Sequence, residues 1–177
     1  MIPIFSWEFQ IIEAAKHWPR TGLFHFLMYN LSDYSTVVYL ILVLLVISIL
    51  KKGYRPVLPL FLLCLLTTLL SEVISRKIFK IIFMRPRPNF VSLGCHESYC
   101  WGFISSHTTV SFSVAILLTL YNRKNLYWAF PIAIMISFSR IYLAEHFPLD
   151  VIVGAIVGII LGCLVWSIYL RIHKIYH

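Results

Sequence analysis

One stretch of this chain, Ser139 to Asp150, places an arginine, a histidine and a carboxylate between two strongly apolar segments. Arg140 can bind an anion, His146 can attack as a nucleophile or carry a proton, and Asp150 can fix the tautomer of an imidazole. Ionisable groups beside membrane-like segments are costly and commonly serve a function. The alternative is a structural ion pair between Arg140 and Asp150, with His146 as an interfacial polar residue.

A second cluster follows an earlier apolar segment, where Lys80 precedes the run Arg85-Pro86-Arg87-Pro88. The prolines end and stiffen a helix, and the basic side chains at its exit are suited to phosphate oxygens. An anchor for lipid headgroups would use the same residues.

A third polar stretch, Ser105-Ser106-His107, opens another apolar segment. A serine there can cap a helix whose free amides and dipole attract an anion, with the histidine held in the same field. A plain serine cap beside an incidental histidine is the alternative.

The composition predicts the environment of these residues. The chain has 177 residues, of which 60% are hydrophobic and only 12% charged, and its mean hydropathy is +0.85. These values indicate an integral membrane protein. The formal net charge of +8 comes from short basic clusters beside apolar runs, a pattern typical of membrane topology signals and anion sites. We therefore expect a lipid bilayer and no nucleic acid as partner.

The elements that must position the polar clusters are helices. We expect an all-α membrane protein with an N-terminal amphipathic helix, Ile2 to Trp18, lying in the interface and ending at Pro19. Residues 1–33 then form an N-terminal interfacial segment and residues 34–177 a transmembrane catalytic domain. The latter has five predicted spans: Tyr34 to Leu50, Val57 to Leu70 and beyond, Ser105 to Leu120, Tyr127 to Leu143, and Leu149 to about Leu170.

Basic turns predict the orientation of these spans. An excess of lysine and arginine marks cytoplasmic loops, which places the following residues on one side: Lys51, Lys52, Arg55, Arg123, Lys124, Arg171 and Lys174. Four other basic residues then face outward, against the usual bias: Lys80, Arg85, Arg87 and Arg140. An anionic ligand accounts for them.

Glycines and cysteines add two structural expectations. Gly154, Gly158 and Gly162 recur every four residues and predict close packing against another helix. Cys95 and Cys100 share an outward loop, where a disulfide or two free thiols are the alternatives. The other two cysteines, Cys64 and Cys163, lie inside predicted spans.

Together the three polar clusters resemble the motifs of the type 2 phosphatidic acid phosphatase (PAP2) family. Lys80, six further residues and Arg87-Pro88 match the first motif. Ser139-Arg140, five residues, His146, three residues and Asp150 match the third. The second motif, usually Pro-Ser-Gly-His, reads Ile104-Ser105-Ser106-His107 and so departs at Ile104 and Ser106.

The resemblance implies a mechanism. His146 would attack phosphorus to form a phosphohistidine, Asp150 would hold its other nitrogen, and His107 would protonate the leaving oxygen and then activate water. The phosphoryl group would be cradled by Lys80, Arg87, Arg140, Ser105 and backbone amides near Ser106. No metal or other cofactor is expected, since no compact set of carboxylate, cysteine or histidine ligands stands out.

The implied function is a lipid phosphatase at the outer, periplasmic face of a bacterial cytoplasmic membrane. Within the family the chain looks most like small enzymes that act on undecaprenyl diphosphate or the 1-phosphate of lipid A. The charged cluster with Arg85 exceeds what one phosphomonoester requires, which favours a diphosphate or a second phosphate. The alternatives are a phosphatidylglycerophosphate phosphatase, a lipid phosphotransferase, and a catalytically silent protein that binds or transports lipid phosphates. The sequence assigns no oligomeric state and no role to Glu72, Glu97 or Glu145.

Overall fold

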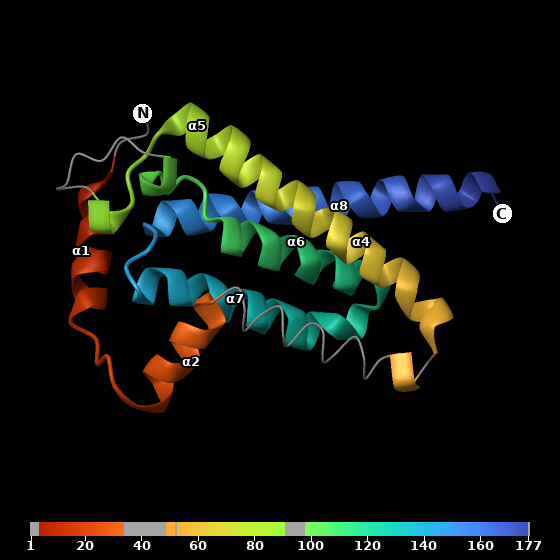
Figure 1. Cartoon of the computed structure of the whole chain (residues 1–177), viewed down its shortest axis with the longest axis horizontal. Coiled ribbons are helices and arrows are strands. Elements are labelled where there is room, and N and C mark those ends of the chain that lie inside the picture. The colour runs from red at the N-terminus through yellow and green to blue at the C-terminus, as the bar shows by residue number, and fades with distance from the viewer. Residues whose placement is uncertain (1–3, 34–48, 52, 91–97, 177) are drawn as a thin grey trace.

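The computed structural model describes residues 4–33, 49–51, 53–90 and 98–176. Within these ranges every regular element is a helix, and one isolated antiparallel bridge joins Pro86 to Trp101. Four long helices run side by side as a bundle (Figure 1): α4 (Tyr54–Val73), α6 (Ser106–Tyr121), α7 (Leu126–Tyr142) and α8 (Pro148–Tyr176). The all-α prediction is confirmed for this part of the chain.

Helix α6 lies at the centre of the bundle and contacts α8, α7 and α4. Its contact with α7 is built from small side chains, Ala115 against Ala129 and Ala133, with Phe112 and Phe130 packed around them. Small residues let two helix backbones approach closely.

The contact between α6 and α8 is closer still, because α8 presents glycine to it. A Cβ atom at Gly154 would lie 3.1 Å from the carbonyl oxygen of Ser105, and a Cβ at Gly158 would clash with the carbonyl oxygen of Thr109. Gly162 faces Ser113 in the same way. The predicted packing role of the three glycines is confirmed.

Serine hydroxyls join α4 and its extension to α6. Ser71 donates a hydrogen bond to Ser113 (3.0 Å), and Ser75 donates one to Ser106 (2.9 Å). After Val73 the helix continues as a π-helical segment, Ile74–Phe79, and then as the short α5, Lys80–Phe83. π-Helical segments commonly occur at functional sites. Here the segment leads directly into the buried Lys80.

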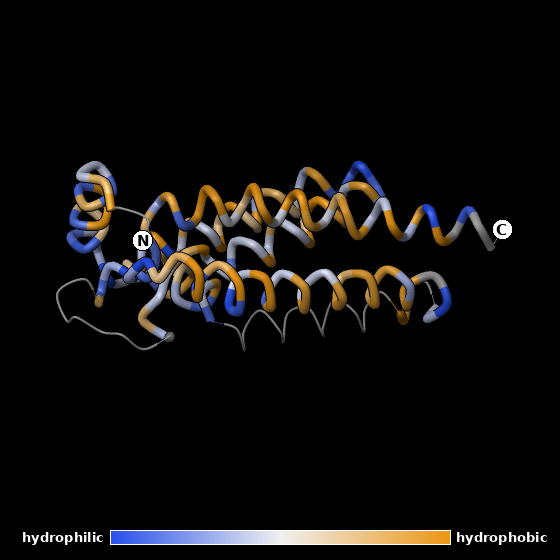
Figure 2. The backbone as a smooth tube through the Cα atoms, turned by 90° about the horizontal axis from the view of Figure 1, so that it is seen from above, coloured by the Kyte–Doolittle hydropathy of each residue, from blue (hydrophilic) through white to orange (hydrophobic). Residues whose placement is uncertain are grey.

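Two stretches of helix are long and apolar enough to cross a membrane: Val57–Phe83, with a mean hydropathy of 2.3, and Pro148–Ile172, with 2.7. Only 11% and 28% of their most apolar 18-residue stretches are buried inside the protein, so these stretches are largely exposed on the outside of the bundle. Figure 2 shows that the long helices consist mainly of hydrophobic residues. Helix α6 is apolar but shorter. The first predicted span, Tyr34 to Leu50, falls largely outside the described residues, and the count of five spans stays a prediction.

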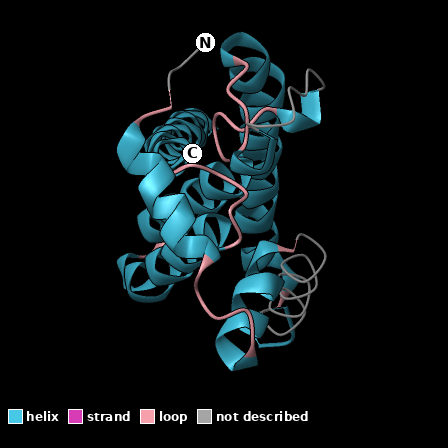
Figure 3. Ribbon diagram, turned by 90° about the vertical axis from the view of Figure 1, so that its left-hand side faces the viewer, coloured by secondary structure: helices cyan, strands magenta, loops and turns pink. Residues whose placement is uncertain are grey.

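The N-terminal segment forms two helices across one end of the bundle, the end that faces the viewer in Figure 3. Helix α1 (Ser6–Lys16) ends before Pro19, as expected, and packs Ile12 against Phe147 of the α7–α8 connection. Helix α2 (Gly22–Ser32), which contacts α7, was not predicted.

Candidate active site

His146 lies in the connection between α7 and α8. Ala144 adopts a left-handed conformation, with φ of 55°, and this turns the chain back onto the end of α7. The amides of Glu145 and His146 then donate to the carbonyl oxygen of Arg140, at 2.9 and 3.3 Å. The turn buries His146, which is 1% exposed, at the end of α7, the helix that carries Arg140.

Asp150 lies in the first turn of α8, four residues after His146. One carboxylate oxygen, Oδ2, accepts the amide of Phe147 at 3.0 Å and lies 3.6 Å from Nδ1 of His146. The other oxygen accepts a hydrogen bond from Arg85. The residue is fully buried. Asp150 is therefore fixed by two donors and faces the imidazole nitrogen that it was predicted to hold.

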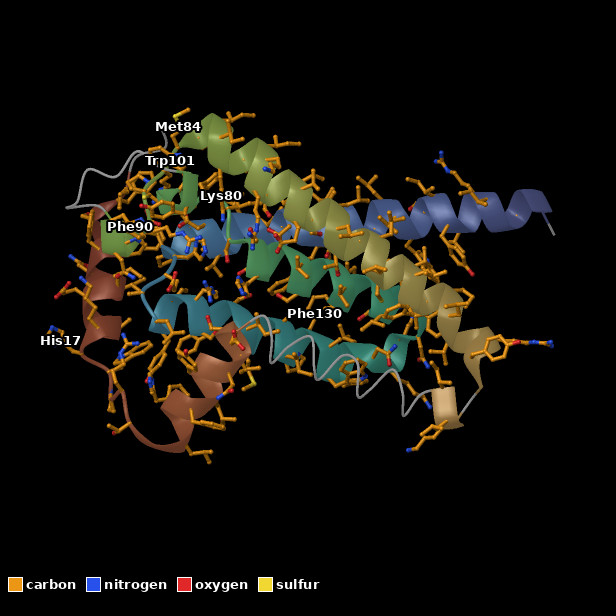
Figure 4. All side chains as sticks on the ribbon, viewed as in Figure 1. His17, Lys80, Met84, Phe90, Trp101 and Phe130 are labelled. Atoms are coloured by element: carbon orange, nitrogen blue, oxygen red, sulfur yellow. The ribbon has the colours of Figure 1, made fainter. Side chains whose placement is uncertain are left out.

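Three predicted phosphate-binding cations gather around His146. Burial lowers the pKa of its imidazole well below the ordinary 6.5, and the charges of Arg87, Arg140 and Lys80 lower it further. A backbone hydrogen bond at Gly102 opposes them. Lys80 is itself buried (Figure 4). Because the pKa is lowered, His146 is neutral and has a nitrogen lone pair available for attack.

Both arginines are held by protein groups. Arg87 donates from Nε to the carbonyl oxygen of Trp101 (3.3 Å) and from Nη1 to Glu145 (2.9 Å). Arg140 donates to the carbonyl oxygen of Ser32 (3.1 Å) and to its hydroxyl, and its Nη2 lies 3.7 Å from the same oxygen of Glu145. The carboxylate of Glu145 thus bridges the two guanidinium groups that were predicted to bind phosphate.

The second motif, Ile104 to His107, forms the start of α6 and lies beside the third motif, Ser139 to Asp150. The amide of Ser105 donates to the carbonyl oxygen of Asp150 at 3.1 Å, which ties the first turn of α6 to the first turn of α8. His107 lies on that turn, within electrostatic range of His146 and Arg140. All three predicted catalytic residues are therefore at one end of the bundle.

The departure at Ser106 has a structural explanation. Its hydroxyl accepts the hydrogen bond from Ser75, so the side chain joins α6 to the π-helical segment. The residue is 3% exposed. The extra side chain is accommodated within the helix contact.

Two buried charged residues beside the site were misjudged or missed from the sequence. Arg85, which we grouped with the outward cations, is fully buried and forms ion pairs with Asp150 and with Glu8 of α1. Its charge is therefore matched by protein carboxylates, and it was wrong to count Arg85 among the cations that favour a second phosphate. Glu8 is also fully buried. No local pattern marks this contact, because 77 positions separate Glu8 from Arg85.

The stretch from Cys100 to Gly102, just before the second motif, lies against Arg85 and Arg87. Arg87 donates its amide to the carbonyl oxygen of Cys100 (2.9 Å), and Gly102 donates to that of Arg85 (2.7 Å). A Cβ at Gly102 would lie 3.2 Å from the carboxylate of Asp150, so glycine permits this approach. Cys100 is buried and disulfide-bonded. Cys95 lies outside the described residues, and its pairing with Cys100 stays a prediction.

The site combines a buried imidazole with three cations, an arrangement that suits transfer of a phosphoryl group. Among the residues that the structure describes, no group of three or more histidine, cysteine, aspartate or glutamate side chains could hold a metal ion. Lys80, Arg87 and Arg140 supply the positive charge around His146.

Two known proteins are similar in sequence to part of this chain. A lipid A 4′-phosphatase of Porphyromonas gingivalis is 34% identical over 116 residues, which cover 60% of this chain and 49% of that protein. The undecaprenyl-diphosphatase BcrC of Bacillus subtilis is 30% identical over 100 residues, 54% of this chain and 51% of that protein. The matched segment spans about half the length of these relatives.

Two crystal structures have a similar fold. LpxE of Aquifex aeolicus superposes with a TM-score of 0.67 at 26% identity, covering 94% of this chain and 99% of that one. A PAP2-type phosphatidylglycerolphosphate phosphatase of Bacillus subtilis gives 0.66 at 25% identity, covering 94% and 86%. The sequence profile of the PAP2 superfamily matches residues 61–174, which include every predicted site residue, and the chain belongs to that superfamily.

Proposed function

We propose that this protein removes a phosphate from a membrane lipid phosphate or diphosphate through a phosphohistidine on His146. The observation that carries the proposal is the buried imidazole, with Asp150 on one side and the charges of Lys80, Arg87 and Arg140 around it. A catalytically silent lipid-binding or transport protein would need the cations but not this imidazole and carboxylate pair.

The proposed reaction has two displacements. The phosphate binds to the two arginines and Lys80 in place of Glu145, and Ser105 with the first amides of α6 adds donors. Nε2 of His146 attacks phosphorus, since Nδ1 faces Asp150, and the bond to the leaving oxygen breaks as His107 protonates that oxygen. His107 then takes a proton from water, which attacks phosphorus, breaks the N–P bond and releases phosphate.

The substrate is proposed to be a lipid, because apolar side chains on the outside of the helices suit an acyl or prenyl tail. The names of the relatives support undecaprenyl diphosphate or a phosphate of lipid A. The likeness to the Bacillus subtilis phosphatase supports phosphatidylglycerophosphate as a second candidate. With Arg85 neutralised inside the protein, charge does not decide between a monoester and a diphosphate.

The proposed location is the bacterial inner membrane, with several spans and the site facing the periplasm. The basic turn between α6 and α7 and the C-terminal end of α8 lie at the end of the bundle opposite the α7–α8 connection (Figure 1), and basic ends favour the cytoplasm. We further propose residues 34–177 as the catalytic domain and residues 1–33 as a distinct N-terminal segment. A cysteine placed at Asn125 should resist an impermeant thiol reagent added from outside, and labelling in intact cells would invert this orientation.

The function is tested by phosphate release from purified protein in detergent. The panel contains undecaprenyl diphosphate, lipid A, phosphatidylglycerophosphate and a soluble sugar phosphate, each with and without a chelator. We expect fast release from one lipid, slow release from the soluble ester and little effect of the chelator. Release that collapses with chelator and returns with magnesium would contradict the metal-independent mechanism, and the preferred lipid separates the two candidate substrates.

A further inference from the structure

A carboxylate of the N-terminal helix α1 is built into the active site. Glu8 is fully buried, although charged residues are almost never buried without partners. Its Oε1 accepts the amide of Leu149 at 3.1 Å, and its Oε2 accepts the amide of Phe5 at 3.1 Å. The same Oε2 forms the ion pair with Arg85. The residue therefore joins α1 to the first turn of α8, the turn that carries Asp150.

Arg85 lies between two carboxylates. One terminal nitrogen pairs with Glu8 and the other with Asp150, and the guanidinium lies over the ring of Phe147 at 5.0 Å from its centroid. All three charged side chains are fully buried. With His146 they form a continuous array of carboxylate, guanidinium, carboxylate and imidazole.

The charges of this array bear on the chemistry. Glu8, Arg85 and Asp150 together carry one net negative charge beside His146. Without Glu8 the guanidinium would neutralise Asp150 one to one, and the positive charge that develops on the imidazole during attack would lose its counterion. In a buried site such a change is weakly screened by solvent.

We propose that Glu8 is a positioning residue of the reaction: it shares Arg85 with Asp150 and binds the turn of Asp150, so that the carboxylate stays oriented toward His146 and the array keeps a net negative charge. This inference rests on the proposed role of His146 as nucleophile. A merely structural Glu8 would hold α1 in place without affecting the chemical step.

The test compares Glu8→Gln, which keeps the shape and removes the charge, with Glu13→Gln, which changes an exposed glutamate of the same helix. For Glu8→Gln we expect kcat to fall about tenfold or more while KM changes by less than about twofold, because Glu8 contacts none of the phosphate-binding cations. Glu13→Gln should keep both constants. A folded Glu8→Gln enzyme with normal kcat would overturn the proposal.

A double-mutant cycle identifies the route. Since Glu8 acts through Asp150, Glu8→Gln should cost little further activity in an Asp150→Asn background. If Glu8→Gln lowers kcat by the same factor in the wild-type and the Asp150→Asn backgrounds, the proposal is overturned. If Glu8→Gln does not fold, Glu8→Asp and Arg85→Lys answer the question. Both keep the buried charge but disturb the bridge, so each should lower kcat at constant KM, and normal kcat in both would overturn it.

The outcome is separable from that of the proposed function. Loss of activity in His146→Ala with normal kcat in Glu8→Gln would reject only the role of Glu8. Retained activity in His146→Ala would reject the phosphohistidine mechanism, whatever Glu8→Gln does.

Discussion

Glu145 contacts both arginines of the proposed phosphate site, and removal of its charge should strengthen anion binding. The carboxylate contacts Arg87 at 2.9 Å and approaches Arg140 to 3.7 Å. A phosphate that binds both guanidinium groups competes with this carboxylate for them. We therefore expect Glu145→Gln, which keeps the shape and removes the charge, to lower the inhibition constant of a phosphate analogue.

The magnitude follows from distance and exposure. Unit charges at these separations interact by about 5 kcal/mol at an effective dielectric constant of 20. The Glu145 side chain is 37% exposed and that of Arg87 20%, so solvent screening and side-chain ordering reduce the net value to about 1 kcal/mol. Each 1.4 kcal/mol corresponds to a factor of ten, so the inhibition constant should fall about fivefold.

The assay is inhibition of phosphate release by orthovanadate and by inorganic phosphate at pH 7. Glu13→Gln is the matched control, because its carboxylate is exposed and lies on α1 away from both arginines. Higher ionic strength should reduce the difference between wild type and Glu145→Gln. An inhibition constant that is unchanged or raised in Glu145→Gln would refute the reasoning and indicate that Glu145 supports the arginines while phosphate is bound.

Three further outcomes are expected. His146→Ala should abolish turnover, and Asp150→Asn should lower kcat by about 10²- to 10⁴-fold. His17→Ala, at an exposed position, is the control and should have normal turnover. Phosphate release measures all three variants, and near-normal turnover in His146→Ala would reject His146 as the nucleophile. Because burial and nearby cations lower the pKa of His146 well below 6.5, the imidazole stays neutral at pH 6.5, and kcat/KM should fall only at lower pH. An acidic limb of the pH profile at or above pH 6.5 would contradict the lowered pKa. Gly158→Ala should destabilise the α6–α8 contact by about 1 to 3 kcal/mol and so lower Tm by roughly 3 to 10 °C. Ile156→Val, at an exposed position, is the control. An unchanged Tm in Gly158→Ala would show that the two helices can separate slightly without loss of stability.

The sequence predicted the chemical groups of the site because short spacings define them. The interval between His146 and Asp150 is one helical turn, and the two side chains do face each other across 3.6 Å. The serines before α6 and the basic turn after it likewise predicted helix ends that the structure confirms within a residue or two, at Ser106 and Tyr121.

The residues that support the site could not be predicted, because their contacts join distant parts of the chain. Glu8 looked like one polar residue of an amphipathic helix, and Arg85 looked like one cation of an outward cluster. Only the position of α1 across the end of the bundle brings them together. Ser32 is similar, since it meets Arg140 across 108 positions. Helix α2, which carries Ser32, was missed because its sequence is apolar and short.

The glycine contact between α6 and α8 affects how a lipid could reach His146. The two helices meet backbone to backbone, so no layer of side chains between them can rearrange to widen the site. Helices α1 and α2 cover the same end of the bundle, with Ile12 and Phe9 packed on Phe147 and with Glu8 and Ser32 paired to buried arginines. We therefore expect α6 and α8 to serve as a fixed wall that keeps His107 and His146 aligned while a lipid headgroup binds.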